Sequence, residues 1–379
     1  MPEAKRRSGQ ALKVALVCPT VGQTRRGYER FFTDLHSVLG PDIDVHLFKG
    51  AGASGPRETV VPHLRRTGLM SRLVGQRLAY RRYQLEHASF AAMLMPALRR
   101  GGFDVVHVID PPLARHLQTV RRLAGLHFRL LYTHGGPAVV DPGAGVDHVH
   151  CLTQPAQDQM RGLGVPEERL TVVPVGVHFD RFRAAATRAA LREQWRIPAG
   201  RAVVLCVGAV NRHHKRIDHL IREMAAAGGD ALLWLDGSLH PDGDVTLLDL
   251  GRSLLGDRFC YTEVESRRVG ELYALADLLV SAAVDESFGM AIVEAMSTGL
   301  PVLVHDSPHF QALLGAGAHR VDMVTPGALA QTLSALLRAL PVQRPLSDPQ
   351  AAVAHFGWSA LRADYIQLYG RLQALEHAH

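Results

Sequence analysis

Apolar and polar residues alternate in short blocks along this chain, and the blocks predict strands separated by helices. Short continuous apolar runs are typical of strands that are buried on both faces. In the first half we predict strands at residues 13–18, 45–48, 103–108, 129–133, 149–152 and 171–174, and helices at 28–39 and 113–123. In the second half we predict strands at 202–207, 231–235, 259–262, 278–281 and 302–304, and a helix at 218–226.

This order of elements predicts an α/β fold with two Rossmann-like domains. Strands that alternate with helices form parallel sheets covered by helices on both faces. The 379 residues also exceed what one ordinary core holds. We therefore predict one domain at residues 1–180 and a second at 181–355, with the linker between 176 and 200. An amphipathic helix at 358–375 is predicted in the C-terminal segment 356–379.

Composition and charge narrow the class of protein. Hydrophobic residues make up 47% and charged residues 21% of the chain, which indicates a globular protein. No apolar run approaches the roughly 20 residues of a membrane helix, and the polar start of the chain does not resemble a signal peptide. We therefore expect a cytoplasmic protein. The four cysteines are scattered without metal-ligand spacing and are expected to be free thiols.

The net charge of +6 is unevenly distributed. Residues 1–180 hold 23 Lys and Arg against 15 Asp and Glu, whereas residues 181–379 hold 19 against 21. The first half is therefore expected to bind an anionic partner or to lie near an anionic surface.

The most informative stretch carries two acidic residues, Glu286 and Glu294, after the apolar run 278–284. A turn of small residues opens a helix after Glu286, and Gly299 ends that helix. Glu294 lies about two helical turns deeper on nearly the same face. In a doubly wound sheet this unit places both carboxylates at the carboxyl ends of the strands, where ligands bind. The competing interpretation is a pair of solvated acids, although the apolar neighbours of Glu294 argue against it.

Residues 286–289 (Glu-Ser-Phe-Gly), 294–296 (Glu-Ala-Met) and 299–302 (Gly-Leu-Pro-Val) resemble the E-x7-E signature of retaining glycosyltransferases of family 4. That family includes sucrose synthases and bacterial mannosyltransferases, and weaker similarity extends over residues 13–369. The resemblance implies the GT-B fold, in which two Rossmann-like domains face each other across a cleft and the C-terminal helix crosses back to the first domain. It implies transfer of a sugar from a nucleotide-diphosphate sugar to an acceptor hydroxyl with retention of configuration, without a cofactor or an obligatory metal.

The resemblance also implies roles for the residues of this signature. Glu286 contacts the donor sugar and Glu294 the ribose hydroxyls of the donor nucleotide. In the turn Ser287, Phe288 and Gly289, the last two offer backbone N–H groups to sugar or phosphate at the helix start. Val264 ends a run, residues 261–264, that faces the base mainly through the backbone.

A basic loop at residues 207–216 follows one predicted strand and precedes a helix. Gly208 and the cations after it suit a phosphate group. By the resemblance, Lys215 binds the diphosphate and stabilises the leaving nucleotide. Relatives have an arginine directly after the glycine where this chain has Ala209, so Arg212 or Arg216 supplies the missing charge, or the donor is held by fewer contacts. A solvated basic loop is the alternative, and His213 and His214 lack a third ligand for a metal.

Four residues of the first half are candidate site residues: Gly27 for binding the donor, His134 for catalysis, and Gly22 and Asp110 for binding the acceptor. Gly27 opens the first helix and can approach the donor diphosphate, and Gly22 is either a turn for the acceptor site or an ordinary loop glycine. His134 follows a predicted strand and matches a family histidine that lies beside the transferred sugar. Asp110 also follows a strand and is a weaker candidate for contact with the acceptor.

The segment 62–100 is basic and is interleaved with apolar residues. It fits a peripheral membrane patch near a lipid-linked acceptor, a pocket for a phosphorylated acceptor, or a solvated helix face, and the sequence does not choose among them. No recognised nucleic-acid module is present. No GxGxxG follows the first strand of either half, which argues against a nicotinamide enzyme. Two rival functions stay open: a sugar-nucleotide epimerase and a non-catalytic scaffold that binds sugar nucleotides.

Overall fold

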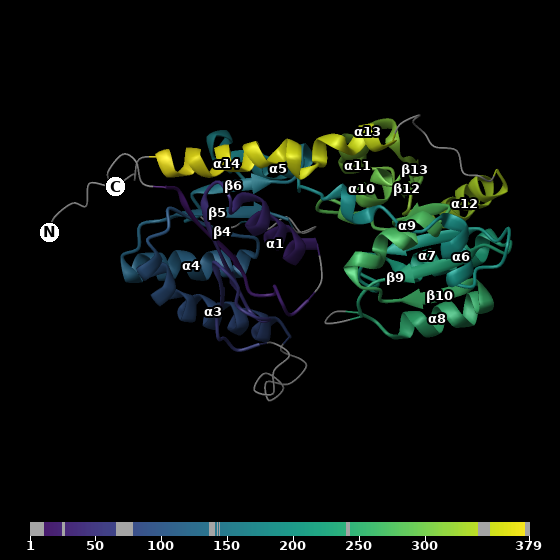
Figure 1. Cartoon of the computed structure of the whole chain (residues 1–379), viewed down its shortest axis with the longest axis horizontal. Helices are drawn as coiled ribbons and strands as arrows, with labels where there is room; N and C mark the ends of the chain where they lie inside the picture. Colours follow the sequence, from purple (N-terminus) through teal and green to yellow (C-terminus); the bar gives the residue numbers. More distant parts are fainter. Residues whose placement is uncertain are drawn as a thin grey trace. The chain divides into compact units, whose positions relative to one another are not determined.

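The structure is a computed structural model that describes residues 11–24, 27–65, 79–135, 141, 143, 145–239, 243–339 and 349–375. The chain forms two compact units (Figure 1). Unit 1 comprises Met1–Leu152, Ala156–Val173 and Arg362–His379, and unit 2 comprises Thr153–Pro155 and Pro174–Leu361. Each unit has its own sheet and its own core, as two Rossmann-like domains require.

Unit 1 contains a seven-stranded parallel sheet in the order β3-β2-β1-β4-β5-β6-β7. Its strands are β1 (Lys13–Cys18), β2 (Asp44–Lys49), β3 (Glu58–Val60), β4 (Val105–Val108), β5 (Arg129–His134), β6 (His148–Cys151) and β7 (Leu170–Val172). The strand order reverses between β1 and β4, because the chain leaves β1 toward β2 and later returns to β1's other side. Such a reversal opens a crevice at the carboxyl ends of the two strands.

Helices cover both faces of this sheet. They are α1 (Gly27–Leu39), α3 (Ala79–Gly101), α4 (Pro111–Ala124), α5 (Gln154–Gly162), η2 (Glu167–Arg169) and part of α14 (Trp358–Ala374). Apolar residues of α3, α4 and α5 share one core cluster with the strands, and α3 and α4 lie together on that face (Figure 1). On the other face, Phe31 of α1 contacts Tyr365 of α14 at a ring-centroid distance of 5.9 Å. The helix α14, which begins in unit 2, therefore ends as part of the first unit's core.

A buried row of hydrogen bonds ties α14 to three strands of unit 1. His107 Nδ1 lies 2.7 Å from the Tyr369 hydroxyl, and His107 Nε2 lies 2.5 Å from the Thr133 hydroxyl. His150 Nδ1 lies 2.8 Å from the same Thr133 oxygen, and His150 Nε2 lies 2.7 Å from the Val173 carbonyl oxygen. Since that carbonyl only accepts, the row runs in one direction from the Tyr369 O–H to Val173, with both imidazoles neutral.

Unit 2 contains a six-stranded parallel sheet in the order β10-β9-β8-β11-β12-β13. Its strands are β8 (Val203–Val207), β9 (Leu232–Asp236), β10 (Phe259–Thr262), β11 (Leu278–Val280), β12 (Val302–His305) and β13 (His319–Val321). Here the order reverses between β8 and β11, which are hydrogen-bonded neighbours. The loops that follow β8 and β11 therefore flank the crevice of this sheet.

The helices of unit 2 also lie on both faces of its sheet. The α-helices are α6 (Arg188–Gln194), α7 (Ile217–Ala227), α8 (Thr246–Leu255), α9 (Val269–Leu275), α10 (Met290–Ser297), α11 (Pro308–Leu314), α12 (Ala328–Arg338) and α13 (Pro349–Val353). Short 3-10 turns are η3 (Phe179–Phe182), η4 (Gly256–Arg258), η5 (Ser266–Arg268), η6 (Gly315–Gly317) and η7 (Ala354–Phe356). Apolar residues of α7, α8 and α12 form one core cluster with the strands.

Every strand and helix for which the sequence predicted bounds lies within two residues of an observed element, and the strands at 13–18 and 259–262 match exactly. The sequence assigned no bounds to several helices, among them α5, α8, α9, α11 and α12. It missed two strands, β3 and β13. Each has three residues and lies at an edge of its sheet. Neither segment, 58–60 or 319–321, forms a buried apolar run. Among the described residues, no helix is both long and apolar enough to cross a membrane.

Candidate functional site

An ion pair links the two loops that flank the crevice of unit 2. Lys215, in the loop after β8, donates from Nζ to the Glu286 carboxylate, in the loop after β11. Their side chains are 19% and 4% exposed. The two residues are far apart in the sequence, and they meet because β8 and β11 are adjacent parallel strands.

The loop that presents Lys215 is held by Asn211. The Asn211 side-chain oxygen accepts the backbone N–H groups of His214 and Lys215 at 3.0 and 2.9 Å. The Asn211 carbonyl oxygen accepts the N–H of Ile217, the first residue of α7, at 3.1 Å. Asparagine favours such local turns because its side chain can substitute for a backbone acceptor. The position of Lys215 is therefore set by its own loop.

Glycines at the ends of β8 and β9 allow a close backbone approach beneath this loop. Gly208 and Gly237 have φ angles of +150° and +152°, which side chains rarely adopt. A Cβ on Gly237 would lie 1.8 Å from the Gly208 carbonyl oxygen, and a Cβ on Gly208 would lie 3.0 Å from Cε of Lys215. Gly208 thus leaves room for the lysine chain to reach Glu286.

The charge of Glu286 is set by its neighbours. Burial alone would raise the pKa of Glu286, but Lys215 and His214 outweigh this effect and lower the pKa to about 2. His214 Nε2 lies 3.4 Å from the second carboxylate oxygen. Glu286 is therefore an ionised group that only accepts hydrogen bonds, with a cation beside it.

Glu294 lies on α10, deeper in unit 2. Its side chain is buried and accepts a hydrogen bond of 2.8 Å from the Tyr273 hydroxyl. A buried carboxylate needs a hydroxyl or cationic partner, and Tyr273 supplies the hydroxyl. Gly289, in the left-handed conformation, caps the start of α10. Beside it, the Phe288 ring is buried against Phe356 with a centroid distance of 5.3 Å.

The turn that contains Ser287 joins Glu286 to this buried aromatic residue. Ser287 is half-buried.

Neither arginine considered as a replacement at Ala209 points its guanidinium at the Lys215–Glu286 pair. Arg212 donates to Asp244 at 2.6 Å and to the Thr246 hydroxyl at 2.9 Å. Arg216 donates to the backbone carbonyl of Met323 at 2.6 Å. In this structure, Lys215 is the cation that the loop directs to Glu286.

The segment predicted to face a base lies at the end of β10. The Val264 N–H donates to the Asp236 carboxylate at 2.9 Å, and the Thr262 hydroxyl donates to the same oxygen at 2.8 Å. The Val264 N–H is thus already used by Asp236. Burial raises the pKa of Asp236 although both hydrogen bonds oppose this shift.

The predicted site residues of unit 1 lie at one edge of its sheet, beside the crevice. Gly22 and Gly27 lie in and after the loop that follows β1, and Asp110 follows β4, the strand next to β1. A Cβ on Gly22 would lie 2.2 Å from the Ala51 carbonyl oxygen, and φ there is +82°. This packing accounts for a glycine at position 22 without any ligand, whereas Gly27 is the first residue of α1.

Asp110 turns its carboxylate toward α3. Pro111 and Pro112 occupy the first turn of α4, and prolines lack the N–H groups that a capping carboxylate would accept. Asp110 instead accepts from the Tyr83 hydroxyl at 2.8 Å, and its other oxygen lies 3.5 Å from Nε2 of the buried His87. Burial would lower the pKa of His87, but Asp110 outweighs burial and raises it.

His134 ends β5, one strand further along the same edge. It is 3% exposed, and burial lowers its pKa although a hydrogen bond with Gln159 opposes this shift. Nε2 lies 3.3 Å from the Gln159 side-chain oxygen, and the buried Nδ1 has no hydrogen-bond partner within the described part of the chain. A neutral imidazole with one unused nitrogen suits a polar ligand atom.

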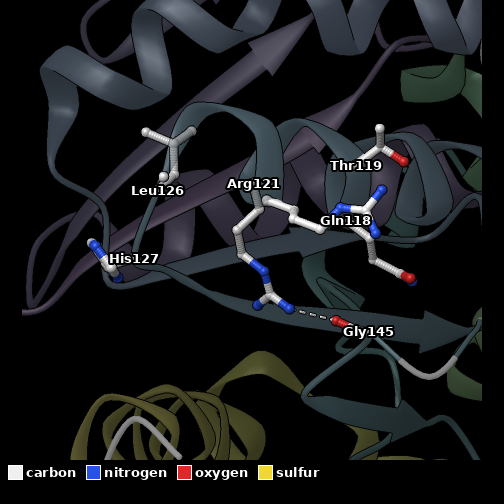
Figure 2. Close-up of a pocket in the computed structure, with 8 residues that line it drawn as sticks. Gln118, Thr119, Arg121, Leu126, His127 and Gly145 are labelled. Carbon is white, nitrogen blue, oxygen red and sulfur yellow. Dashed lines mark hydrogen bonds between the residues drawn. The ribbon is translucent and has the colours of Figure 1, made fainter. Parts of the chain in front are cut away.

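A separate hollow of about 580 Å³ lies at the C-terminal end of α4 (Figure 2). Its lining includes Gln118, Arg121, His127 and Gly145. Arg121 is already paired with Asp147 and donates to the Gly145 carbonyl oxygen at 2.7 Å. The helix α4 ends where β5 begins, so this hollow is at the opposite sheet edge from Asp110 and His134, and no predicted site residue lines it.

The described residues contain no cluster of three or more His, Cys, Asp or Glu side chains that could hold a metal. All four cysteines are free, and three of them are buried. In the basic segment 62–100, Arg66, Arg72 and Arg77 lie outside the described residues. On α3, the exposed Arg81, Arg99 and Arg100 do not distinguish among the three interpretations of that segment.

The sequence missed several residues that complete the two sites. Asn211 and Tyr273 position Lys215 and Glu294, and His87 lies beside Asp110. His309, in the helix that starts after β12, lies at the same sheet edge as Glu286 because β12 is the neighbour of β11. Its position after a predicted strand was the signal that would have found it.

Two family models match this chain. Glycosyl transferases group 1 matches residues 187–343, in unit 2, and Glycosyltransferase Family 4 matches residues 25–181. The chain belongs to the family 4 glycosyltransferases. The E-x7-E pair and Lys215 lie within the first match, and Gly27, Asp110 and His134 lie within the second.

Curated relatives match this chain over little more than half of its length. D-inositol 3-phosphate glycosyltransferase of Xylanimonas cellulosilytica is 28% identical over 237 residues, 57% of this chain and 54% of that protein. GDP-mannose-dependent alpha-(1-6)-phosphatidylinositol dimannoside mannosyltransferase of Mycobacterium tuberculosis is 26% identical over 232 residues, 60% of this chain and 59% of that protein. The chain thus spans little more than half the length of these relatives.

Solved structures share the fold over nearly the whole chain. Sucrose-phosphate synthase from Thermosynechococcus elongatus is similar with a TM-score of 0.81 at 18% identity, covering 96% of this chain and 99% of that one. Anabaena Alr3699/HepE in complex with UDP-glucose gives 0.74 at 17% identity, covering 95% and 100%. The GT-B fold predicted from the signature is therefore confirmed.

Proposed function

We propose that this protein transfers a hexose from a nucleotide-diphosphate sugar to an acceptor hydroxyl with retention of anomeric configuration. The observation that supports this most is the pairing of Lys215 with Glu286 at the crevice of unit 2. A cation beside an ionised carboxylate offers one partner for a diphosphate and one for sugar hydroxyls. Membership of the glycosyltransferase family favours transfer over an epimerase or a scaffold.

In the proposed reaction, Lys215 exchanges Glu286 for the donor diphosphate. The bond between the anomeric carbon and the diphosphate oxygen breaks, and the acceptor oxygen bonds to that carbon from the same face. The acceptor proton passes to the departing diphosphate oxygen, so that the products are a glycoside and a nucleoside diphosphate. Lys215 stabilises the negative charge that develops on the leaving group. The reaction needs no metal, because Lys215 supplies the positive charge.

Within unit 2, we propose that Glu286 accepts hydrogen bonds from the donor sugar and Glu294 from the ribose. Unit 1 supplies the residues for the acceptor. There His134 offers its unused nitrogen beside the reacting sugar, and Asp110, oriented by Tyr83 and His87, accepts from an acceptor hydroxyl.

The experiment that tests this function is a donor screen. Thermal stability of the purified protein is measured with UDP-, GDP-, ADP- and dTDP-sugars, among them the UDP-glucose and GDP-mannose that similar proteins bind or use. A ligand at a hundred times its Kd stabilises the folded state by about 2.7 kcal/mol. We expect one nucleotide series to stabilise the protein and Glu294→Ala to lose that stabilisation.

A turnover assay then separates the rival functions. With the donor that binds and a panel of hydroxyl acceptors, including inositol phosphate and phosphatidylinositol glycans, we expect a new glycoside and free nucleoside diphosphate. An epimerised sugar nucleotide in place of the glycoside contradicts the transferase. Binding without any turnover indicates a scaffold.

We also propose that the basic segment contacts an anionic membrane surface. Exposed Leu85 and Met93 lie on α3 with the exposed arginines of that helix. Vesicles that contain anionic lipid should retain the protein at low salt, and Arg99→Glu with Arg100→Glu should weaken this retention. Equal retention by neutral vesicles contradicts the proposal.

A further inference from the structure

The histidine at position 309 has a nitrogen that the rest of unit 2 does not use. His309 lies in the first turn of α11, directly after β12, and its ring packs edge-on against Phe310 with a centroid distance of 5.0 Å. Its Nε2 is buried and has no hydrogen-bond partner in the described ranges of the chain. A buried polar atom without a partner costs free energy, so an apolar residue would serve packing better.

The other ring nitrogen identifies the chemistry of Nε2. The His309 ring forms a hydrogen bond with the Phe288 backbone, and this bond raises the pKa of His309 while burial, the larger effect, lowers it. A bond that raises the pKa is one in which the ring donates an N–H to a carbonyl oxygen. In a neutral imidazole with its single N–H engaged, the remaining nitrogen accepts. Nε2 of His309 is therefore an unused acceptor.

Two carboxylates, Glu286 and Asp285, interact electrostatically with His309. Each raises the pKa of His309 through space. Two acceptors, the Glu286 carboxylate and His309 Nε2, thus belong to residues that follow the adjacent strands β11 and β12. Phosphate oxygens accept hydrogen bonds, so they do not satisfy this nitrogen. A sugar hydroxyl, which donates, does.

We infer that His309 is a specificity-determining residue that accepts a hydrogen bond from one hydroxyl of the donor sugar. This inference rests on the proposed function, since it assigns a further residue to the same donor site. It predicts that the residue affects binding of the sugar and leaves binding of the nucleoside diphosphate unchanged.

The test compares two ligands on one variant. His309→Asn keeps a polar group near the Phe288 carbonyl and removes Nε2. Calorimetry measures the Kd of the stabilising nucleotide sugar and of its nucleoside diphosphate alone, UDP or GDP. We expect the variant to weaken binding of the nucleotide sugar about 3- to 10-fold, as for one neutral hydrogen bond, and to change the Kd of the diphosphate less than 2-fold.

Two further variants distinguish a contact with the sugar from a purely structural effect of the substitution. His219→Asn is the matched control, because His219 on α7 also has a buried Nε2 without a partner in the described chain but has no resolved interaction with Glu286. It should leave both Kd values unchanged. His309→Gln places an amide near the position of Nε2 and should recover part of the lost affinity. Monodeoxy analogues of the sugar add a direct check: one of them should weaken the wild type and not His309→Asn.

The outcomes are distinct. Equal weakening of the nucleotide sugar and of the diphosphate by His309→Asn assigns His309 a structural role and overturns the inference. Unchanged binding of both ligands overturns it as well. If no nucleotide or nucleotide sugar binds the wild type, the proposed donor site itself fails, and the inference fails with it.

Discussion

Lys215 and Glu286 form a partly buried ion pair across the point where the strand order of unit 2 reverses. The pair satisfies the charge of each residue while no donor is bound. In the proposed function, a donor diphosphate replaces Glu286 as the partner of Lys215, which releases the carboxylate for the sugar. The same two residues thus link the stability of unit 2 to its proposed function.

Removing one member of this pair should destabilise the protein more than removing both. Lys215→Met leaves the buried Glu286 charge without its cation and should cost about 3–5 kcal/mol, whereas Lys215→Met with Glu286→Gln should cost much less. Urea unfolding of the wild type, both single variants and the double variant measures the coupling. Additive losses would show that the pair contributes nothing.

The pair should also make the free energy of unfolding depend on pH in the acidic range. The pKa of Glu286 is lowered to about 2 in the folded protein, so its contribution is fully present above the ordinary glutamate pKa. It is lost as the pH falls from about 4.5 toward 2. Urea midpoints measured across this range should fall more steeply for the wild type than for Glu286→Gln. Parallel curves contradict the lowered pKa.

The buried histidines of unit 1 should make stability depend on pH in a higher range than Glu286 does. Burial lowers the pKa of His150 to about 4, and that of His107 well below its ordinary value. The contribution of His150 to stability is fully present above pH 6.5, the approximate pKa of a histidine in the unfolded chain. It is lost as the pH falls from 6.5 to 4, because the unfolded chain then gains a proton that the folded protein does not bind. That loss is about 3 kcal/mol. His150→Gln should flatten the fall of the urea midpoint in this window, whereas His127→Gln, on an exposed histidine, should not.

The glycine contact beneath the basic loop should tolerate no side chain. Gly237→Ala places a Cβ 1.8 Å from the Gly208 carbonyl oxygen and should destabilise the protein by more than 2 kcal/mol. Gly229→Ala, at a φ of +73° and with nothing within 4 Å of the added Cβ, is the control for a positive φ without a close contact and should cost only about 1 kcal/mol. Thermal melts of both variants make the comparison. Similar losses would mean that backbone strain alone, and not the close contact, accounts for the effect.

Chelation should leave the proposed transfer unchanged. Because Lys215 is proposed to neutralise the leaving group, activity in excess EDTA should stay within 2-fold of the untreated rate. Lys215→Ala should lower kcat by about 100- to 1000-fold, as for other lost transition-state contacts. Loss of activity in EDTA that Mg²⁺ restores would contradict the metal-free reaction.

The sequence by itself determined the class of fold and the place of the donor residues. Buried apolar runs in the order strand, helix, strand require parallel sheets, and such a run predicts the exact bounds of the strand at 13–18. The positions of Lys215 and Glu286 after two such runs put both at carboxyl strand ends. Strands β3 and β13 escaped detection because an edge strand is covered on fewer sides and needs no apolar run.

Only the tertiary structure decided which residues meet. Lys215 and Glu286 pair because β8 and β11 are neighbours in the sheet, and strand order is not encoded in local periodicity. The partners of Arg212 and Arg216, the turn of Asp110 toward α3 and the unused nitrogen of His309 also depend on contacts between elements distant in sequence. Local patterns fix elements through short-range burial and turn chemistry, whereas hydrogen bonds and ion pairs at a site depend on how those elements are brought together.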